Sequence, residues 1–258
     1  MTIRIRTDSN EIYREFVDEF LRIVKSEGTR KTFNGNRKQR YAGKYGEAIV
    51  INEIGLNLQD YIDSGFKAEL EYNRVGGDYG IDVEWDGIYI DVKTLIVNIP
   101  VAPGISRAFY HNYNLGQAQD PNNQTDIIIF CIMNVRERML AICGGVAKQE
   151  MVDPEYSISR EKGEEKVRPG GSIHRYQEAE YEITQGQIVN FEKTQDLKGY
   201  IYAYGQYKKG HDSNFQRAEK KRIFEYPQKE VYPGNGILAE IHESNGEKNN
   251  NPKEGARK

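Results

Sequence analysis

Apolar residues near the start of the chain recur every three or four positions, as they do on one face of a helix. Between Ile12 and Ile23 this spacing predicts an amphipathic helix over residues 10–24. A basic loop is expected from Gly28 to Arg40, and a second helix from about Tyr41 to Ile62, which Gly55 is able to divide. Two helices are therefore expected before the first strand.

From residue 66 onwards the apolar positions alternate with polar ones, which is the period of a strand with one buried face. Phe66–Tyr72 is a candidate strand, and Val75–Gly80 is a glycine-rich turn. Two further runs, Ile81–Trp85 and Ile88–Thr94, are separated only by Asp86-Gly87. Asp-Gly between alternating β-formers predicts a tight β-hairpin.

The second half of the chain contains the most apolar segment, Thr125–Met133, which is typical of a central strand covered on both faces. Arg138–Val146 is its expected neighbour, and a helix that crosses the sheet is expected within residues 105–119. A mobile loop is expected at residues 159–171, and further strands are expected at residues 187–193, 200–207 and 223–231.

These elements predict an α/β protein with a single domain over residues 1–241. Its core is expected at about residues 41–146, followed by a β-rich elaboration at about residues 147–241. Residues 242–258 contain almost no apolar side chains to bury, so they are expected to form a disordered polar tail.

The predicted hairpin places unusual side chains on its two faces. A two-residue turn fixes the register, so that Asp82 lies opposite Asp91. Its apolar face consists of Ile81, Val83, Trp85, Ile88, Ile90 and Val92, and its polar face of Asp82, Glu84, Tyr89, Asp91 and Lys93. Two carboxylates opposite each other repel, and a divalent cation such as Mg²⁺ would neutralise them. Lys93 would then lie beside the metal.

Charge is distributed unevenly along the 258-residue chain, whose formal net charge is only -3. Residues 22–44 carry eight cations and one carboxylate, and residues 208–222 carry six cations and two carboxylates, whereas residues 51–100 carry ten carboxylates and three cations. Two basic segments around an acidic centre suit a protein that holds a polyanion at its edges; ordinary solvated surface is the alternative. The candidate DNA-binding cations are Arg30, Lys31, Arg37, Lys38, Arg40, Lys44, Lys208, Lys209, Arg217, Lys220, Lys221 and Arg222.

Composition excludes several classes of protein. With a mean hydropathy of -0.76 and no apolar stretch of eighteen residues, the sequence predicts no membrane span. The N-terminal residues lack the pattern of a secretory signal, so a cytoplasmic protein is expected. Cys131 and Cys143 are too few for a disulfide framework or a four-cysteine zinc site, and both are expected to be buried.

The residues around the hairpin resemble a known signature. Asp82, followed after eight residues by Asp91-Val92-Lys93, looks like the motif of the PD-(D/E)XK nucleases, the catalytic core of many restriction endonucleases and Holliday-junction resolvases. Gly43-Lys44-Tyr45-Gly46-Glu47 looks like the helix that supplies a glutamate in that family. The resemblance covers roughly residues 41–133. No proline precedes the first acid, and Asp78 is an alternative to Asp82 in that position.

The resemblance implies a restriction-endonuclease-like mixed sheet flanked by helices, and Mg²⁺-dependent hydrolysis of phosphodiester bonds. It assigns Asp82, Asp91 and the carbonyl group of Val92 to the metal, with Glu47 as a further ligand through water or at a second ion, and Lys93 to the attacking water. Mn²⁺ is expected to substitute for Mg²⁺.

By the same analogy, the long C-terminal part favours a homodimeric, restriction-type endonuclease acting on double-stranded DNA. A Holliday-junction or other structure-specific nuclease is an alternative. A non-catalytic nucleic-acid-binding protein on the same scaffold and a β-rich ligand-binding module are alternatives of other classes. Gln117 and Gln119 lie where related nucleases sometimes place a polar residue near the site, and His111 is interpreted as a structural histidine or, alternatively, as a DNA contact or a base.

Overall fold

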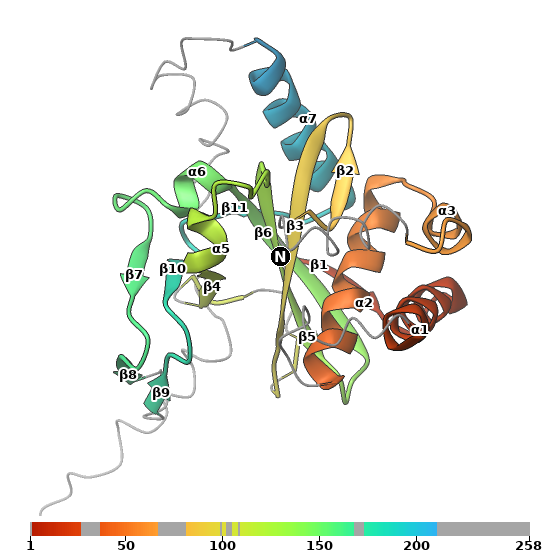
Figure 1. Cartoon of the computed structure of the whole chain (residues 1–258), viewed down its shortest axis with the longest axis horizontal. Coiled ribbons are helices and arrows are strands. Elements are labelled where there is room, and N and C mark those ends of the chain that lie inside the picture. Colours follow the sequence, from red (N-terminus) through yellow and green to blue (C-terminus); the bar gives the residue numbers. More distant parts are fainter. Residues whose placement is uncertain are drawn as a thin grey trace, which may run out of the picture.

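The main sheet has mixed strand directions and forms the centre of the protein (Figure 1). The structure, a computed structural model, describes residues 2–26, 37–66, 81–98, 100–101, 105–107, 109–167 and 173–210, with the side chains of Val24, Ser26 and Arg37 excepted. The strand order is β1 (Ile3–Arg6), β6 (Met139–Ala147), β5 (Ile127–Asn134), β3 (Ile88–Ile96) and β2 (Val83–Trp85), and β11 (Val189–Asn190) also pairs with β6. Among the described strands of this sheet, β3 and β5 run parallel and the other pairs are antiparallel.

Helices cover one face of this sheet, and their apolar side chains form the larger core with it. The helices are α1 (Glu11–Ser26), α2 (Arg37–Ile54), α3 (Leu58–Asp63) and α7 (Thr194–Gly210). Helix α2 approaches β3 closely at Gly46, because a β-carbon there would overlap the Oγ1 atom of Thr94 and lie 3.5 Å from a methyl group of Val92. Glycine therefore allows the helix to lie directly on the strand that carries the predicted site.

A small sheet covers the opposite face of the main sheet. It consists of β4 (Tyr110–Asn114), β10 (Glu180–Thr184) and β7 (Ile158–Arg160), and it is accompanied by the short helices α5 (Leu115–Gln119) and α6 (Lys148–Met151). Tyr113 and Ile183 point inward and share a second core with Ile128 and Phe130 of β5. Strand β5 is consequently buried on both faces, as its continuous apolar sequence predicted.

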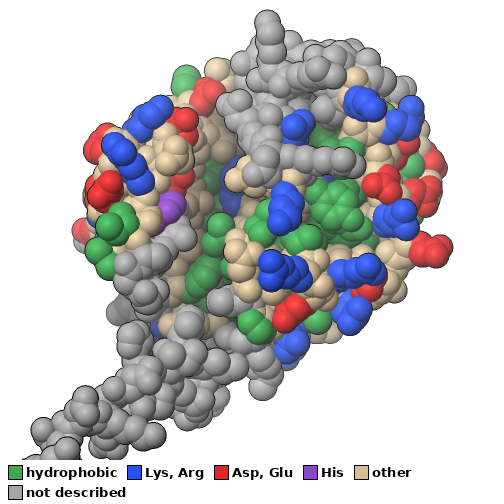
Figure 2. Space-filling model, turned by 90° about the horizontal axis from the view of Figure 1, so that it is seen from below, with side chains coloured by type: hydrophobic (Ala, Val, Ile, Leu, Met, Phe, Trp, Pro, Cys, Tyr) green, Lys and Arg blue, Asp and Glu red, His purple; other side chains and the backbone are tan. Residues whose placement is uncertain are grey.

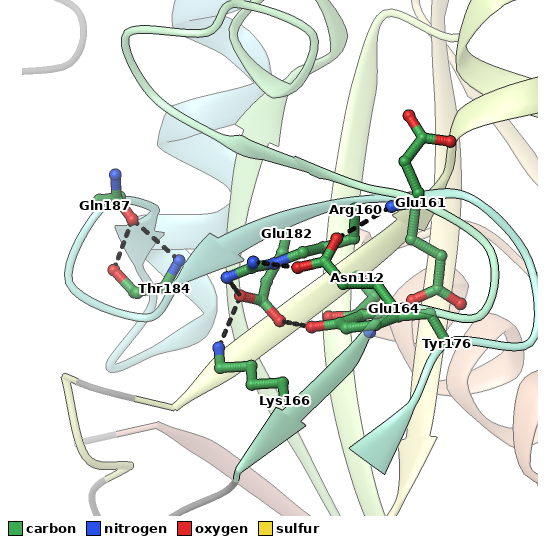
Figure 3. A network of polar contacts seen from close by, with 10 residues as sticks. Asn112, Arg160, Glu161, Glu164, Lys166, Tyr176, Glu182, Thr184 and Gln187 are labelled. Atoms are coloured by element: carbon green, nitrogen blue, oxygen red, sulfur yellow. Dashed lines mark hydrogen bonds and ion pairs between the residues drawn. The ribbon is translucent and has the colours of Figure 1, made fainter.

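A polar network covers the outer face of the small sheet (Figure 3). Glu182 is buried and accepts hydrogen bonds from Tyr176, from Lys166 at 2.6 Å and from Arg160 at 3.5 Å. Lys166 belongs to a two-stranded hairpin of β8 (Glu165–Val167) and β9 (Ile173–Arg175). These bonds hold the hairpin against the small sheet, and they satisfy a carboxylate that would be costly to bury alone.

The predicted helices of the N-terminal part are confirmed, but strand β1 precedes both of them, so the expectation that two helices come before the first strand was wrong. Helix α1 occupies the expected position, and the second predicted helix is divided at Gly55, whose φ of +93° suits glycine. Helix α2 begins at Arg37, so residues 37–40 are helical and not part of a loop. Residues 27–36 and 67–80, which include the predicted strand and the glycine-rich turn before the hairpin, lie outside the described residues.

Three predictions for the second half were wrong. Residues 110–119 form a strand followed by one short helix, because Asn114 ends β4 and caps α5. Residues 200–207 belong to α7, in which Leu197, Tyr200, Ile201 and Tyr204 form one buried face at helical spacing. Strands β7 (residues 158–160) and β8 (residues 165–167) overlap the predicted mobile loop at residues 159–171. The predicted strand at residues 187–193 is reduced to β11, and residues 211–258 lie outside the described residues.

Cys131 and Cys143 are both buried, as predicted. Among the helices that the structure describes, none has both the length and the apolar character needed to cross a membrane.

Candidate functional site

The hairpin of β2 and β3 carries the candidate site, and its turn is formed as the sequence predicts. Trp85 pairs with Ile88, Glu84 with Tyr89 and Val83 with Ile90. Asp86 and Gly87 have φ values of +51° and +76°, the left-handed conformation that two-residue hairpin turns require. The predicted register is therefore confirmed for these three pairs.

The ladder ends at Val83, so the predicted backbone pairing of Asp82 with Asp91 was wrong. The amide of Asp82 instead donates to the carbonyl of Ile90 at 2.9 Å, and its carboxylate accepts a hydrogen bond from the amide of Val92 at 2.7 Å. The strand bends here because two successive residues face Ile90. Asp82 nevertheless lies beside Asp91, since its carboxylate interacts electrostatically with that of Asp91.

Asp91 is almost completely buried, with an exposed fraction of 1%. Burial raises the pKa of Asp91 well above its ordinary value, Lys93 lowers it, and the neighbouring Asp82 raises it again. The ammonium of Lys93 lies 2.9 Å from Asp91 Oδ1, and the Lys93 side chain is 31% exposed. The partly exposed ammonium of Lys93 therefore lies directly beside the buried carboxylate of Asp91.

Gln117 joins these two residues through its side-chain amide. Its Nε2 atom donates to Asp91 Oδ2 at 3.0 Å, and its Oε1 atom accepts a hydrogen bond from Lys93 Nζ at 3.1 Å. Asn123 holds the helix of Gln117 in place by donating to the Gln117 carbonyl at 2.7 Å and to the Tyr113 hydroxyl at 3.0 Å. The sequence marked Gln117 only by its position after the hairpin; the structure shows the contact.

Glu47 and Lys44 form a buried ion pair on α2. The Lys44 ammonium also lies 3.9 Å from the centre of the Phe20 ring. This places Lys44 inside the protein and not among the surface cations that could contact a phosphate. Helix α2 covers the face of β3 that carries Val92, whereas Asp91 and Lys93 point to the other face, so a metal-binding role of Glu47 stays a prediction.

The predicted DNA-binding cations other than Lys44 fall into three groups. Lys208 donates to Asp126 at 2.6 Å and to the Gly87 carbonyl at 3.1 Å, and Lys209 pairs with Asp86 at 2.6 Å, so both fasten α7 to the hairpin. Lys38 is exposed and Arg40 is half-buried at the start of α2. Residues outside the described side chains are Arg30, Lys31, Arg37, Arg217, Lys220, Lys221 and Arg222.

His111 has the surroundings of a structural histidine. It is 3% exposed, its ring stacks on Phe130 with centroids 4.7 Å apart, and its Nε2 atom lies 2.5 Å from Gln185 Oε1. Burial lowers the pKa of His111 to about 4, against a weaker opposing effect of Gln185. A neutral, enclosed imidazole of this kind holds the small sheet on the main sheet.

Neither the family models, nor the curated proteins, nor the solved structures contain a match to this chain. The chemistry of the site therefore follows from its own residues and their geometry.

Asp91, Lys93 and Gln117 lie on the side of the main sheet that faces the small sheet. Seen from below, the molecule is hollowed between the lobe of the small sheet and the body that carries the helices (Figure 2). Among the described residues, no three or more His, Cys, Asp or Glu side chains gather closely enough to hold a metal ion. Two carboxylates and one lysine, oriented by an amide, are thus the chemical groups that the described site offers.

Proposed function

We propose that this chain is a magnesium-dependent endonuclease of the PD-(D/E)XK type, with a restriction-endonuclease-like fold. The observation that carries the proposal is the contact of the buried Asp91 with Asp82, Lys93 and Gln117. If these residues had only a structural role, two adjacent carboxylates and a half-exposed lysine at the edge of a core would be unfavourable for the stability of the protein. Binding of a cation makes the same combination favourable.

The donor set fits a hard divalent cation. Asp91 and Asp82 would hold Mg²⁺, with the carbonyl of Val92 as a third oxygen; Mn²⁺ accepts similar ligands. Asp82 already uses one oxygen on the amide of Val92, which leaves its other oxygen for a metal. A metal bound there would lower the pKa of a coordinated water molecule and would place positive charge beside the scissile phosphate.

Lys93 and Gln117 would have separate roles in the reaction. Lys93, whose side chain is 31% exposed, would hold the attacking water and stabilise negative charge on the phosphate. Gln117 would keep the Lys93 ammonium pointing along Asp91, because its amide oxygen accepts from the lysine while its amide nitrogen donates to the acid. The arrangement therefore orients the Lys93 ammonium and the Asp91 carboxyl group before substrate arrives.

The substrate class and the assembly are part of the proposal. Double-stranded DNA is the expected substrate, cleaved on both strands by a homodimer of the restriction type. The exposed Lys38 is one cation available for contact with the DNA backbone. A Holliday-junction or other structure-specific nuclease would use the same hydrolytic site.

The test is cleavage of supercoiled, linear and four-way-junction DNA, with Mg²⁺, with Mn²⁺ and with EDTA. The wild-type protein should cut in either metal and not in EDTA. Asp91→Asn and Lys93→Ala should each lower the rate at least about a hundredfold, and Gln117→Leu should lower it more than Gln117→Glu at equal DNA affinity. Glu84→Gln, an exposed change in the same hairpin, is the matched control and should cut normally.

The competing classes give different results. A non-catalytic nucleic-acid-binding protein would retain DNA without cutting it and would ignore Mg²⁺, and a ligand-binding module would show no salt-dependent retention at all. Equal damage to DNA by the wild type, Asp91→Asn and Lys93→Ala would show that a contaminant does the cutting. If all of them leave a panel of genomic and branched DNA intact, the proposed activity is wrong.

A further inference from the structure

A second lysine approaches the site from another element. Lys148 begins α6, directly after β6, and its amide donates to the carbonyl of Asp126 at 2.9 Å, which extends the pairing of β5 with β6 by one position. The amide of Asp126 in turn donates to Tyr89 of β3 at 2.8 Å. Lys148 is therefore level with Tyr89, two strands away from β3.

Side-chain alternation places Lys148 on the same face of the sheet as Asp91. Val146 belongs to the core under the small sheet and Ala147 to the core under the helices, so Lys148 returns to the side of the small sheet. Helices α5 and α6 lie together on that side (Figure 1). The Cα atoms of Lys148 and Asp91 are about 12 Å apart by strand spacing, and the Lys148 ammonium is close enough to Asp91 to interact with it electrostatically.

The Lys148 ammonium is held by the same residue that supports Gln117. Its Nζ atom donates to the carbonyl of Asn123 at 2.7 Å, while the side chain of Asn123 bonds to Gln117 and Tyr113. The ammonium also interacts electrostatically with Asp120, Asp91 and Asp126. Burial lowers the pKa of Lys148, against which these three carboxylates act.

Lys148 has more hydrogen-bonding capacity than the described residues use. An ammonium has three donors, and within the described part of the chain the hydrogen bond to Asn123 uses one of them. A lysine that served only to fasten the segment of Asn123 would have no need to be half-buried near the acid of the site. A lysine that binds an anion gains from such partial burial, because the interaction of opposite charges is stronger where water is scarce.

We propose that Lys148 binds a phosphate of the substrate strand adjacent to the scissile one. The inference rests on the proposed nuclease function and adds to it a second cationic contact, on the opposite side of Asp91 from Lys93. Two ammonium groups, one on β3 and one after β6, would hold consecutive phosphates of one strand and so fix the scissile bond over Asp91. Such contacts position the strand without reading its sequence.

The test compares Lys148→Gln with Lys148→Arg. Glutamine keeps one donor for the Asn123 carbonyl but has no charge, and arginine keeps both. DNA affinity is measured by fluorescence anisotropy over a range of salt concentrations, with Asp91→Asn as the background so that DNA is not cut. Lys148→Gln should weaken binding roughly tenfold at low salt and reduce the salt slope by about one, and Lys148→Arg should restore both.

Lys162→Gln is the matched control, since Lys162 is an exposed lysine of the small lobe, 4.0 Å from Glu178. Unchanged affinity and salt slope in Lys148→Gln would overturn the inference, even if thermal stability falls, because the lysine would then serve only to hold Asn123. Absence of DNA binding and cleavage in the wild type would overturn the proposed function itself. If Lys148→Gln does not fold, wild-type affinity in Lys148→Arg supports the cationic contact, and loss of affinity in a folded Lys148→Arg contradicts it.

Discussion

Acidification tests whether His111 is enclosed as the structure shows. The imidazole lies between the two sheets, stacked on Phe130 and bonded to Gln185. Burial lowers its pKa from 6.5 to about 4, so the folded protein keeps His111 neutral in a range where the unfolded chain binds a proton. The contribution of His111 to the free energy of unfolding is therefore fully present above pH 6.5 and is lost as the pH falls toward 4.

The size of the effect follows from the shift in pKa. The difference between a pKa of 6.5 in the unfolded chain and about 4 in the folded protein corresponds to a loss of roughly 3.4 kcal/mol of unfolding free energy, which is complete once the pH is below both pKa values. At pH 5 about 2 kcal/mol of this is already lost, because the unfolded histidine is almost fully protonated there and the folded one is not. That is a large share of the stability of an ordinary domain.

The assay is urea unfolding of the wild type and of His111→Gln at pH 8, 6.5, 5.5 and 5. Glutamine removes the titrating group but keeps an amide that can bond to Gln185. The free energy of the wild type should fall more steeply than that of the variant, by about 2 kcal/mol between pH 8 and pH 5. Contributions of other titrating groups are common to both proteins and cancel in the comparison.

Two results would refute this reasoning. Parallel pH profiles for the wild type and His111→Gln would mean that His111 titrates alike in the folded and unfolded states. An imidazole NMR resonance of His111 with a midpoint near 6.5 in the folded wild type would show the same directly, and it does not depend on the variant folding.

Two further predictions concern the site and the helix that packs behind it. Without metal at pH 8, Asp91→Asn should unfold at a higher temperature than the wild type, because it removes a buried charge beside Asp82. Mg²⁺ should raise the melting temperature of the wild type only. A lower melting temperature of metal-free Asp91→Asn than of the metal-free wild type would contradict this prediction. Gly46→Ala should destabilise the protein by about 1–3 kcal/mol in urea unfolding, because its methyl group would overlap Thr94. Gly43→Ala, on the same helix with nothing within 4 Å of the added carbon, should instead stabilise it by about 0.5–1 kcal/mol, and similar effects of both changes would refute the close packing of α2 on β3.

Local patterns were sufficient for the hairpin and for the apolar strand. Asp86-Gly87 fixed the turn because only a few residue pairs adopt positive φ at both positions, and the alternation on either side then fixed the register. The continuous apolar run of β5 predicted a strand covered on both faces, which the two cores confirm. Asp91 and Lys93 were therefore placed on one face before any tertiary contact was known.

The same local patterns misled in α7. Tyr200, Tyr202 and Tyr204 alternate with smaller residues and resemble a strand, although Leu197, Tyr200, Ile201 and Tyr204 also have helical spacing. The helical interpretation holds in the structure because that face packs into the core of the main sheet and leaves Tyr202 exposed. Only the available partner distinguishes the two periods.

The sequence by itself determined which residues could share a face of one hairpin, because side-chain direction along a strand depends on short-range geometry alone. Tertiary structure decided which residues meet them from elsewhere. Gln117 reaches Asp91 and Lys93 because the parallel pairing of β3 with β5 requires a long connection that returns over the sheet, and that connection carries α5. Glu47 was correctly placed on a helix, where its spacing of three residues from Lys44 brings the two side chains together, but only the packing of α2 against Phe20 of α1 buries this pair.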